Sequence, residues 1–219
     1  MAQPSCSVAS EHFNVINLPS PQKEKWEDLA EHWRTKWFKL FVGEDIPYKE
    51  IATLKITVND RLKVGGGQTT FVIDNSEVHN FRIEIQGPVE GMSNTVLPHE
   101  VMHTILASYY KRGLPRWADE GYCSYIEPIK VNMPWTTRYP FHAIMEMTDY
   151  PPDTKSFYMQ SMSMVDWLIN LKDLKTFRSF LEEAPFGGDH QPALLKYYNF
   201  KSYQEAEQAW NKRSLVKEL

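Results

Sequence analysis

A change of sequence pattern near residue 94 constrains the fold more than any other feature of the chain. Before it, residues 10–18 have the pattern of a short strand, and three further segments are rich in the β-branched and aromatic residues that favour strands. Gly65–Gly67 and Asp74–Asn75 lie between these segments, and the glycine triplet is predicted to be a mobile turn. The three segments are Leu54–Val58, Thr69–Ile73 and Phe81–Gln86. Helical patterns dominate after residue 94, and this order of elements predicts an α+β fold.

One helix is expected before the change of pattern and several after it. Trp26, Trp33 and Trp37 recur at helical spacing between Ser20, a suitable N-cap, and Gly43, which can end a helix. A stripe of this kind is typical of a helix that faces the core. The later helices are predicted at Asn94–Lys111, Pro115–Ile126, Phe157–Leu171, Leu174–Leu181, Ala193–Tyr198 and Ser202–Asn211.

The composition is that of a globular protein, with 42% apolar and 24% charged residues in a chain of 219. The net charge is −4 and no basic stripe with interleaved aromatic residues occurs, which argues against a nucleic-acid partner. The longest apolar runs are too short for a membrane span. Cys6 and Cys123 form no C-x-x-C pair, which argues against cysteine-based zinc sites and redox motifs. We expect thiols here rather than a disulfide.

The first residues leave the location of the protein open. MAQPSCSVAS has neither the basic nor the apolar region of a signal peptide. If a leader has been removed before Met1, the protein is secreted or periplasmic; otherwise it is cytoplasmic.

Residues 97–106, LPHEVMHTIL, contain two histidines that suit a metal site. His99 and His103 are four residues apart, so on a helix they project from one face and can reach one ion. Zinc binds imidazole nitrogens and takes four ligands, which leaves room for a third protein ligand and a water. Glu100 lies where its carboxylate can take a proton from that water and later return it to a leaving amine. The competing interpretation is a buried helix whose histidines are satisfied by hydrogen bonds.

The third ligand is expected from a second helix at residues 115–125, PRWADEGYCSY. Pro115 can start this helix, and a turn at Gly113 would bring it back alongside the first one. Asp119 and Glu120 both offer a carboxylate on its first turns, and zinc accepts either. The residues alone leave the choice between the two open.

The blocks HEVMH, His99 to His103, and WADEGY, Trp117 to Tyr122, resemble the gluzincin metallopeptidases. The chain is most similar to the Peptidase MA-like group of bacterial zinc peptidases, from SEHFNVI near the N-terminus to AEQAW near the C-terminus. This resemblance implies that His99, His103 and Glu120 bind one Zn²⁺ and that Glu100 is the general base. The fold it implies is zincin-like: residues 1–9 a flexible tail, 10–127 a β-sheet with the active-site helices, and 128–219 a helical subdomain that completes the cleft.

The resemblance extends to a group that stabilises the oxyanion of the reaction. Tyr158 matches a tyrosine that donates a hydrogen bond to the oxyanion in related aminopeptidases, where a neutral donor stabilises the developing charge. The competing interpretation of Tyr158 is an aromatic residue in a core helix. His142 and His190 are the alternative donors.

The resemblance also suggests how a substrate would lie. In zincins an edge strand before the zinc helix pairs with the extended substrate, which makes Phe81–Gln86 a candidate, with an interior strand as the alternative. Residues 128–156, rich in Pro, Trp, Tyr and Met, are expected to cover the cleft.

Two positions depart from related enzymes. Glu90 lies only nine residues before His99, much closer than the glutamate with which aminopeptidases bind a free amino terminus. Ser124 stands where thermolysin-like enzymes have an aspartate that orients a zinc histidine.

The expected function is a zinc metallopeptidase acting on peptides or proteins. The short distance between Glu90 and His99 favours an endopeptidase over an aminopeptidase. The alternative is a catalytically inactive zincin-fold protein that binds peptides or protein partners.

Overall fold

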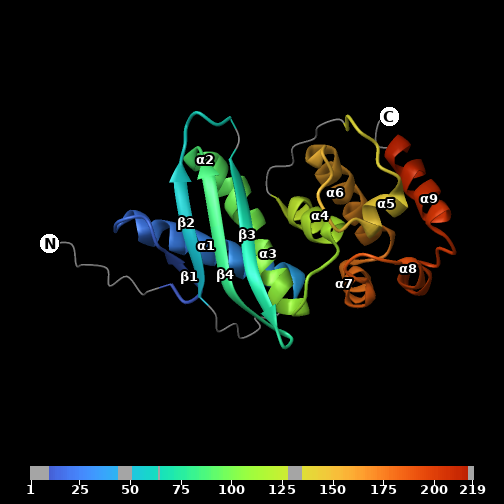
Figure 1. Cartoon of the computed structure of the whole chain (residues 1–219), viewed down its shortest axis with the longest axis horizontal. Coiled ribbons are helices and arrows are strands. Elements are labelled where there is room, and N and C mark those ends of the chain that lie inside the picture. Colours follow the sequence, from blue (N-terminus) through green and yellow to red (C-terminus); the bar gives the residue numbers. More distant parts are fainter. Residues whose placement is uncertain (1–9, 44–50, 64, 128–134, 217–219) are drawn as a thin grey trace. The chain divides into compact units, whose positions relative to one another are not determined.

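The computed structural model describes residues 10–43, 51–63, 65–127 and 135–216 (Figure 1). The chain divides into two compact units, Met1–Arg112 and Gly113–Leu219. The first contains a four-stranded mixed sheet with helices, and the described part of the second is helical. The predicted α+β class with a helical C-terminal half is confirmed. The division falls between Arg112 and Gly113, so the helix at residues 116–126 belongs to the second unit, whereas the sequence grouped it with the sheet.

The sheet of the first unit has the strand order β1-β2-β4-β3 (Figure 1). Its strands are β1 (Phe13–Val15), β2 (Ala52–Val58), β3 (Gly66–Asp74) and β4 (Glu77–Gly87). β2 pairs in parallel with β1 and β4, and β3 pairs antiparallel with β4. All four strands were predicted, within a few residues at their ends.

Of the two alternatives for Phe81–Gln86, the interior strand is correct and the edge strand is wrong, because β4 lies between β2 and β3. Asn75 and Ser76 both have positive φ, which closes a tight hairpin between β3 and β4. β4 then pairs with β2 on its other side, and β3 is left as an edge strand, with β1 at the opposite edge. The break between two strands predicted at Asp74–Asn75 is confirmed.

The glycine triplet is also corrected, because Gly66 and Gly67 belong to β3 and are not a mobile turn. They pair with Gln86 and Ile85 of β4. Glycine is a poor strand former, so local pattern favours a turn here. The local sequence pattern does not show that a helix, α3, packs against this strand.

Helices α1 (Gln22–Phe41) and α3 (Leu97–Tyr110) pack together, and α3 also packs against β3 and β4. The apolar face of the sheet is formed by Leu54, Ile56, Phe81, Ile83 and Ile85, all buried. The tryptophan stripe of α1 is buried as predicted: Trp37 Nε1 donates to the carbonyl of Pro98 at 3.1 Å. The N-cap position is Pro21 and not Ser20, and no side chain caps this end.

The segment before α3 is helical as well. α2 (Val89–Gly91) leads into a π-helical turn, η1 (Met92–Val96), which continues directly into α3. The helical region thus begins before the predicted Asn94, and it ends at Lys111, which has a left-handed conformation. Trp33 Nε1 donates to the carbonyl of Ser93 at 3.1 Å, so a side chain of α1 is hydrogen-bonded to the backbone of the π-helical turn.

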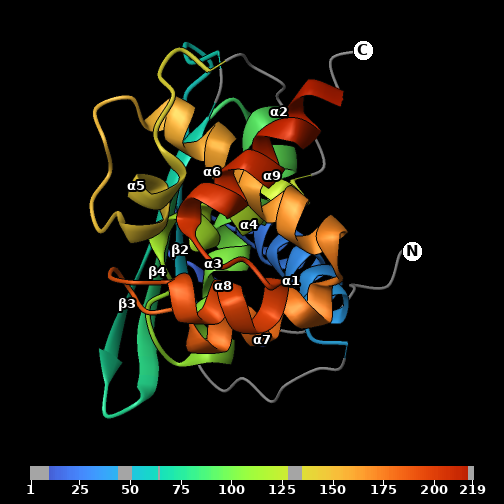
Figure 2. The ribbon, with the colours of Figure 1, turned by 90° about the vertical axis from the view of Figure 1, so that its right-hand side faces the viewer.

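The helices of the second unit are α4 (Arg116–Ile126), α5 (Phe141–Glu146), α6 (Thr154–Leu171), α7 (Leu174–Glu183), α8 (Gln191–Tyr198) and α9 (Tyr203–Val216). All but α5 were predicted. α5 has six residues, too few for a helical period to stand out from the proline-rich segment around it. α7 and α8 pack together (Figures 1 and 2).

The core of the second unit forms where α4 meets α6. Trp117 and Tyr122 of α4 are fully buried and contact the ring of Phe177, which lies on α7. Asp153 and Asp173 cap α6 and α7, since their carboxylates accept hydrogen bonds from backbone N–H groups in the first turn. Within the described residues, no helix is both long and apolar enough to cross a membrane.

Candidate metal centre

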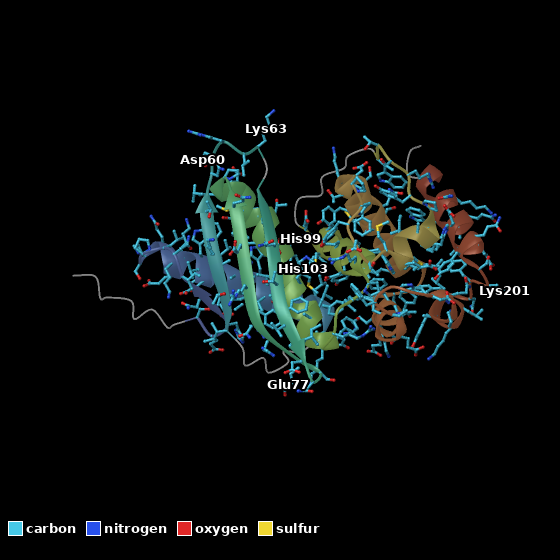
Figure 3. All side chains as sticks on the ribbon, viewed as in Figure 1. Asp60, Lys63, Glu77, His99, His103 and Lys201 are labelled. Atoms are coloured by element: carbon cyan, nitrogen blue, oxygen red, sulfur yellow. The ribbon has the colours of Figure 1, made fainter. Side chains whose placement is uncertain are left out.

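The two histidines of the first unit project from one face of α3 (Figure 3). The ring centroids of His99 and His103 are 4.9 Å apart. His103 is 8% exposed and His99 is half-buried. Two imidazoles at this spacing on one helix face are arranged as a pair of ligands to one ion would be.

Glu100 lies on α3 between the two histidines and faces the sheet. Its side chain is 5% exposed. The hydroxyl of Thr69, on the edge strand β3, lies 2.7 Å from Oε2 of Glu100 and 3.0 Å from its carbonyl oxygen. A buried carboxylate is costly without a partner, and Thr69 supplies a donor.

Glu120 lies on α4 of the second unit and is 6% exposed. Its carboxylate accepts a hydrogen bond from the hydroxyl of Tyr150. Asp119, the competing carboxylate, is half-buried on the same helix. Of the two, Glu120 is therefore the more buried and the one held by a phenol.

Tyr150 is a partner of the candidate ligand Glu120 that the sequence did not single out. Burial, followed by the negative charge of Glu120 and the hydrogen bond to it, raises the pKa of Tyr150 above its usual range. The phenol is therefore a neutral donor at physiological pH. The guanidinium of Arg116 lies 4.4 Å from its ring centroid and donates to the carbonyl of Thr148, which ties this segment to the start of α4. In the sequence, the only indication of Tyr150 was its position in the segment 128–156, which is rich in Pro, Trp, Tyr and Met.

Tyr158 lies on α6, half-buried, with its ring centroid 6.1 Å from that of Tyr150. Two phenols therefore lie side by side in the second unit, one of them bonded to Glu120. The catalytic role of Tyr158 stays a prediction. His142 is exposed on α5, and His190 is fully buried with Nδ1 3.0 Å from the carbonyl of Gly188.

Cys123 is a further possible donor in the second unit. The lack of a C-x-x-C pair argues against a cysteine-based zinc site, but a single thiol can still join other ligands. The thiol of Cys123 is buried on α4, three residues after Glu120, so the two side chains project from one face of that helix. Zinc binds thiolates readily. Cys6 lies outside the described residues.

Comparisons with known proteins add no family to this description. No family model, no curated protein and no solved structure matches the chain.

Proposed function

We propose that this protein is a zinc-dependent metallopeptidase of the gluzincin type. His99, His103 and Glu120 hold one Zn²⁺, and Glu100 is the general base. The donor set fits the ion, because two imidazoles on one helix face and a buried carboxylate are ligands that zinc prefers.

The observation that carries this proposal is the environment of Glu100. A histidine pair in a structural role has no use for an adjacent carboxylate, and burying one costs free energy. Here the carboxylate is 5% exposed and is held by a hydroxyl from a neighbouring strand. Proteins retain such arrangements at functional sites, where local rules of stability are set aside.

Zn²⁺ would supply polarisation of the peptide carbonyl and a lowered pKa of water. Residues of the chain carry out the proton transfers and orient the groups that react. Glu100 takes the proton from the attacking water and returns it to the leaving amine. Tyr150 holds Glu120 by a hydrogen bond, and the neighbouring phenol of Tyr158 is the candidate donor to the oxyanion.

Extended peptide segments are the substrate that suits this site best. β3 is an edge strand and packs against α3, so a peptide could add to the sheet beside Glu100. Glu90 is exposed on α2, in the same continuous helical region as the histidines. Nine residues of helix span about 13 Å, and this arrangement does not favour the capture of a free amino terminus. We therefore favour an endopeptidase.

The test of this function is hydrolysis of a quenched fluorogenic peptide library. The wild-type protein should cleave peptides, and removal of zinc with a chelator should stop cleavage. Glu100→Gln should abolish cleavage while the zinc content stays that of the wild type. Cleavage that survives in Glu100→Gln would overturn the role of this residue.

The buried thiol of Cys123, on the same helix as Glu120, favours a second candidate function. If Cys123 binds the ion together with both histidines and Glu120, four protein ligands close the site and leave no position for water, as in structural zinc sites. The protein would then be a non-catalytic binding module for peptides or protein partners.

Two matched variants separate these functions. The enzyme predicts that Cys123→Ser keeps its zinc and its activity, whereas Glu120→Gln loses both. The binding module predicts that Cys123→Ser loses zinc and that the wild-type protein cleaves no peptide. Zinc content and cleavage are measured on the same preparations.

A further inference from the structure

One position of the sheet departs from the pattern of its inner face. The inward positions of β2 and β4 carry large apolar side chains, such as Leu54 and Ile83. In β3, the residues opposite Ile83 and Ile85 are Thr69 and Gly67. The face of a strand that packs against a helix is normally apolar, so a hydroxyl and a glycine without a side chain are exceptions there. The exception lies where α3 presents Glu100.

Both exceptional residues contact Glu100. The single proton of the Thr69 hydroxyl has two acceptors within reach, Oε2 and the carbonyl oxygen of Glu100. Because both belong to one residue, either hydrogen bond ties the strand to the same point of α3. A Cβ added at Gly67 would lie 2.7 Å from Oε1 of Glu100 and 2.8 Å from Cγ1 of Val96. Gly67 thus provides the space that the carboxylate fills.

We propose that Thr69 is a positioning residue that fixes the carboxylate of Glu100 in the orientation needed for proton transfer. This inference rests on the proposed function, because it assigns Thr69 a role in that reaction. Glu100 has three rotatable side-chain bonds, and the helix restricts only the first of them. A hydroxyl at 2.7 Å, together with the space left by Gly67, selects one arrangement.

The kinetic test compares two substitutions at one position. Thr69→Val removes the hydroxyl and keeps the shape of the side chain, whereas Thr69→Ser keeps the hydroxyl and removes a methyl group. We expect kcat to fall about 10- to 100-fold in Thr69→Val, with KM within about twofold, because a misplaced base slows the chemical step. Thr69→Ser should stay within about threefold of the wild type. Zinc content should be equal in all three proteins.

Thr53→Val is the matched control. Thr53 lies on β2, separated from β3 by one strand, and its hydroxyl donates to the carbonyl of Phe81 and not to Glu100. The substitution removes a strand hydroxyl of the same kind without touching Glu100. Its kcat should equal that of the wild type.

A second measurement does not depend on activity. The protein is labelled with ¹³C at the glutamate carboxyl carbons, and the Glu100 resonance is assigned by its loss in Glu100→Gln. In the metal-free protein this resonance should move in Thr69→Val and stay in place in Thr69→Ser and Thr53→Val. The shift reports the hydrogen bond itself.

The outcomes separate the two claims. Unchanged kcat and an unmoved resonance in Thr69→Val would overturn the inference and leave the proposed function standing. Equal losses of kcat in Thr69→Val and Thr69→Ser would also overturn it, because the methyl group would then be what matters. A wild-type protein that cleaves no peptide would overturn the proposed function and, with it, the role of Thr69 in the reaction. The resonance would then report the contact alone.

Discussion

Each unit of the protein has a glycine beside a proposed site residue, and the two glycines do different work. Gly67 of β3 leaves space for the side chain of Glu100, since a Cβ there would meet side-chain atoms of Glu100 and Val96. Gly121 follows Glu120 on α4, and a Cβ there would lie 2.6 Å from the carbonyl oxygen of Ser161, an atom of the α6 backbone. The first glycine accommodates a side chain, and the second sets the distance between two helices.

The carboxylates of Glu100 and Glu120 also differ in the kind of structure that holds them. Glu100 is held by Thr69, a residue of regular strand structure. Glu120 is held by Tyr150, which lies in the irregular segment between α5 and α6. A base must keep its orientation through proton transfer, whereas a metal ligand is also fixed by the ion it binds. Three predictions test how far this comparison holds.

The largest effect is expected for Gly121→Ala. Because α6 is approached at backbone atoms, the two helices must separate, and no side-chain rotation relieves the contact. Alanine favours a helix by about 1 kcal/mol over glycine, which offsets only part of this cost. We expect a net loss of roughly 3 kcal/mol in the free energy of unfolding, measured with urea.

Gly113→Ala is the control for this prediction. Its added Cβ would make an ordinary contact with Phe186, at 3.7 Å. Its stability should stay within about 0.5 kcal/mol of the wild type. Equal stabilities for the two variants would show that α4 and α6 do not need the close approach.

The next effect is expected for Tyr150→Phe, which removes the hydrogen bond to Glu120 and keeps the ring. Partners of this kind orient a metal ligand, and their loss costs about 10- to 100-fold in metal affinity. We expect the zinc dissociation constant, measured by competition with a chelator, to rise by that factor. Tyr158→Phe is the control: on the proposed roles it should leave zinc affinity unchanged and lower kcat. If zinc affinity falls in Tyr158→Phe instead, the roles of the two phenols are exchanged.

The smallest effect is expected for Gly67→Ala. The atoms it meets are at the ends of side chains, which can move at moderate cost, so we expect a loss of about 1 kcal/mol in stability. Activity should fall more than stability, because Glu100 is what moves. Gly66→Ala is the control, since a Cβ there meets nothing within 4 Å. Equal activity in both variants would contradict the view that Gly67 makes room for the base.

Much of the fold was predictable because it depends on local patterns. The tryptophans of α1, the strands β2 to β4 and the long helices all have a periodicity that survives in the structure. Gly66 and Gly67 were predicted wrongly as a turn, because the reason for glycine at position 67 is the side chain of Glu100 on α3, far away along the chain. Likewise, the edge position of β3 depends on which strands pair, and composition does not determine pairing.

The candidate site was predictable where its residues share one helix. His99, Glu100 and His103 follow from spacing alone, because helix geometry places them. Thr69 and Tyr150 were missed, because each becomes relevant only through a contact that folding creates. Single threonines and tyrosines are too common in sequences to signal such a role.

The most direct test of the central claim is the zinc content of the purified protein and of His103→Ala, measured by inductively coupled plasma mass spectrometry after dialysis. The proposed site predicts one zinc per chain in the wild type and almost none in His103→Ala, with both proteins folded by circular dichroism. A wild-type protein without zinc, or equal zinc in the two proteins, would contradict the claim that α3 carries two ligands of a metal site.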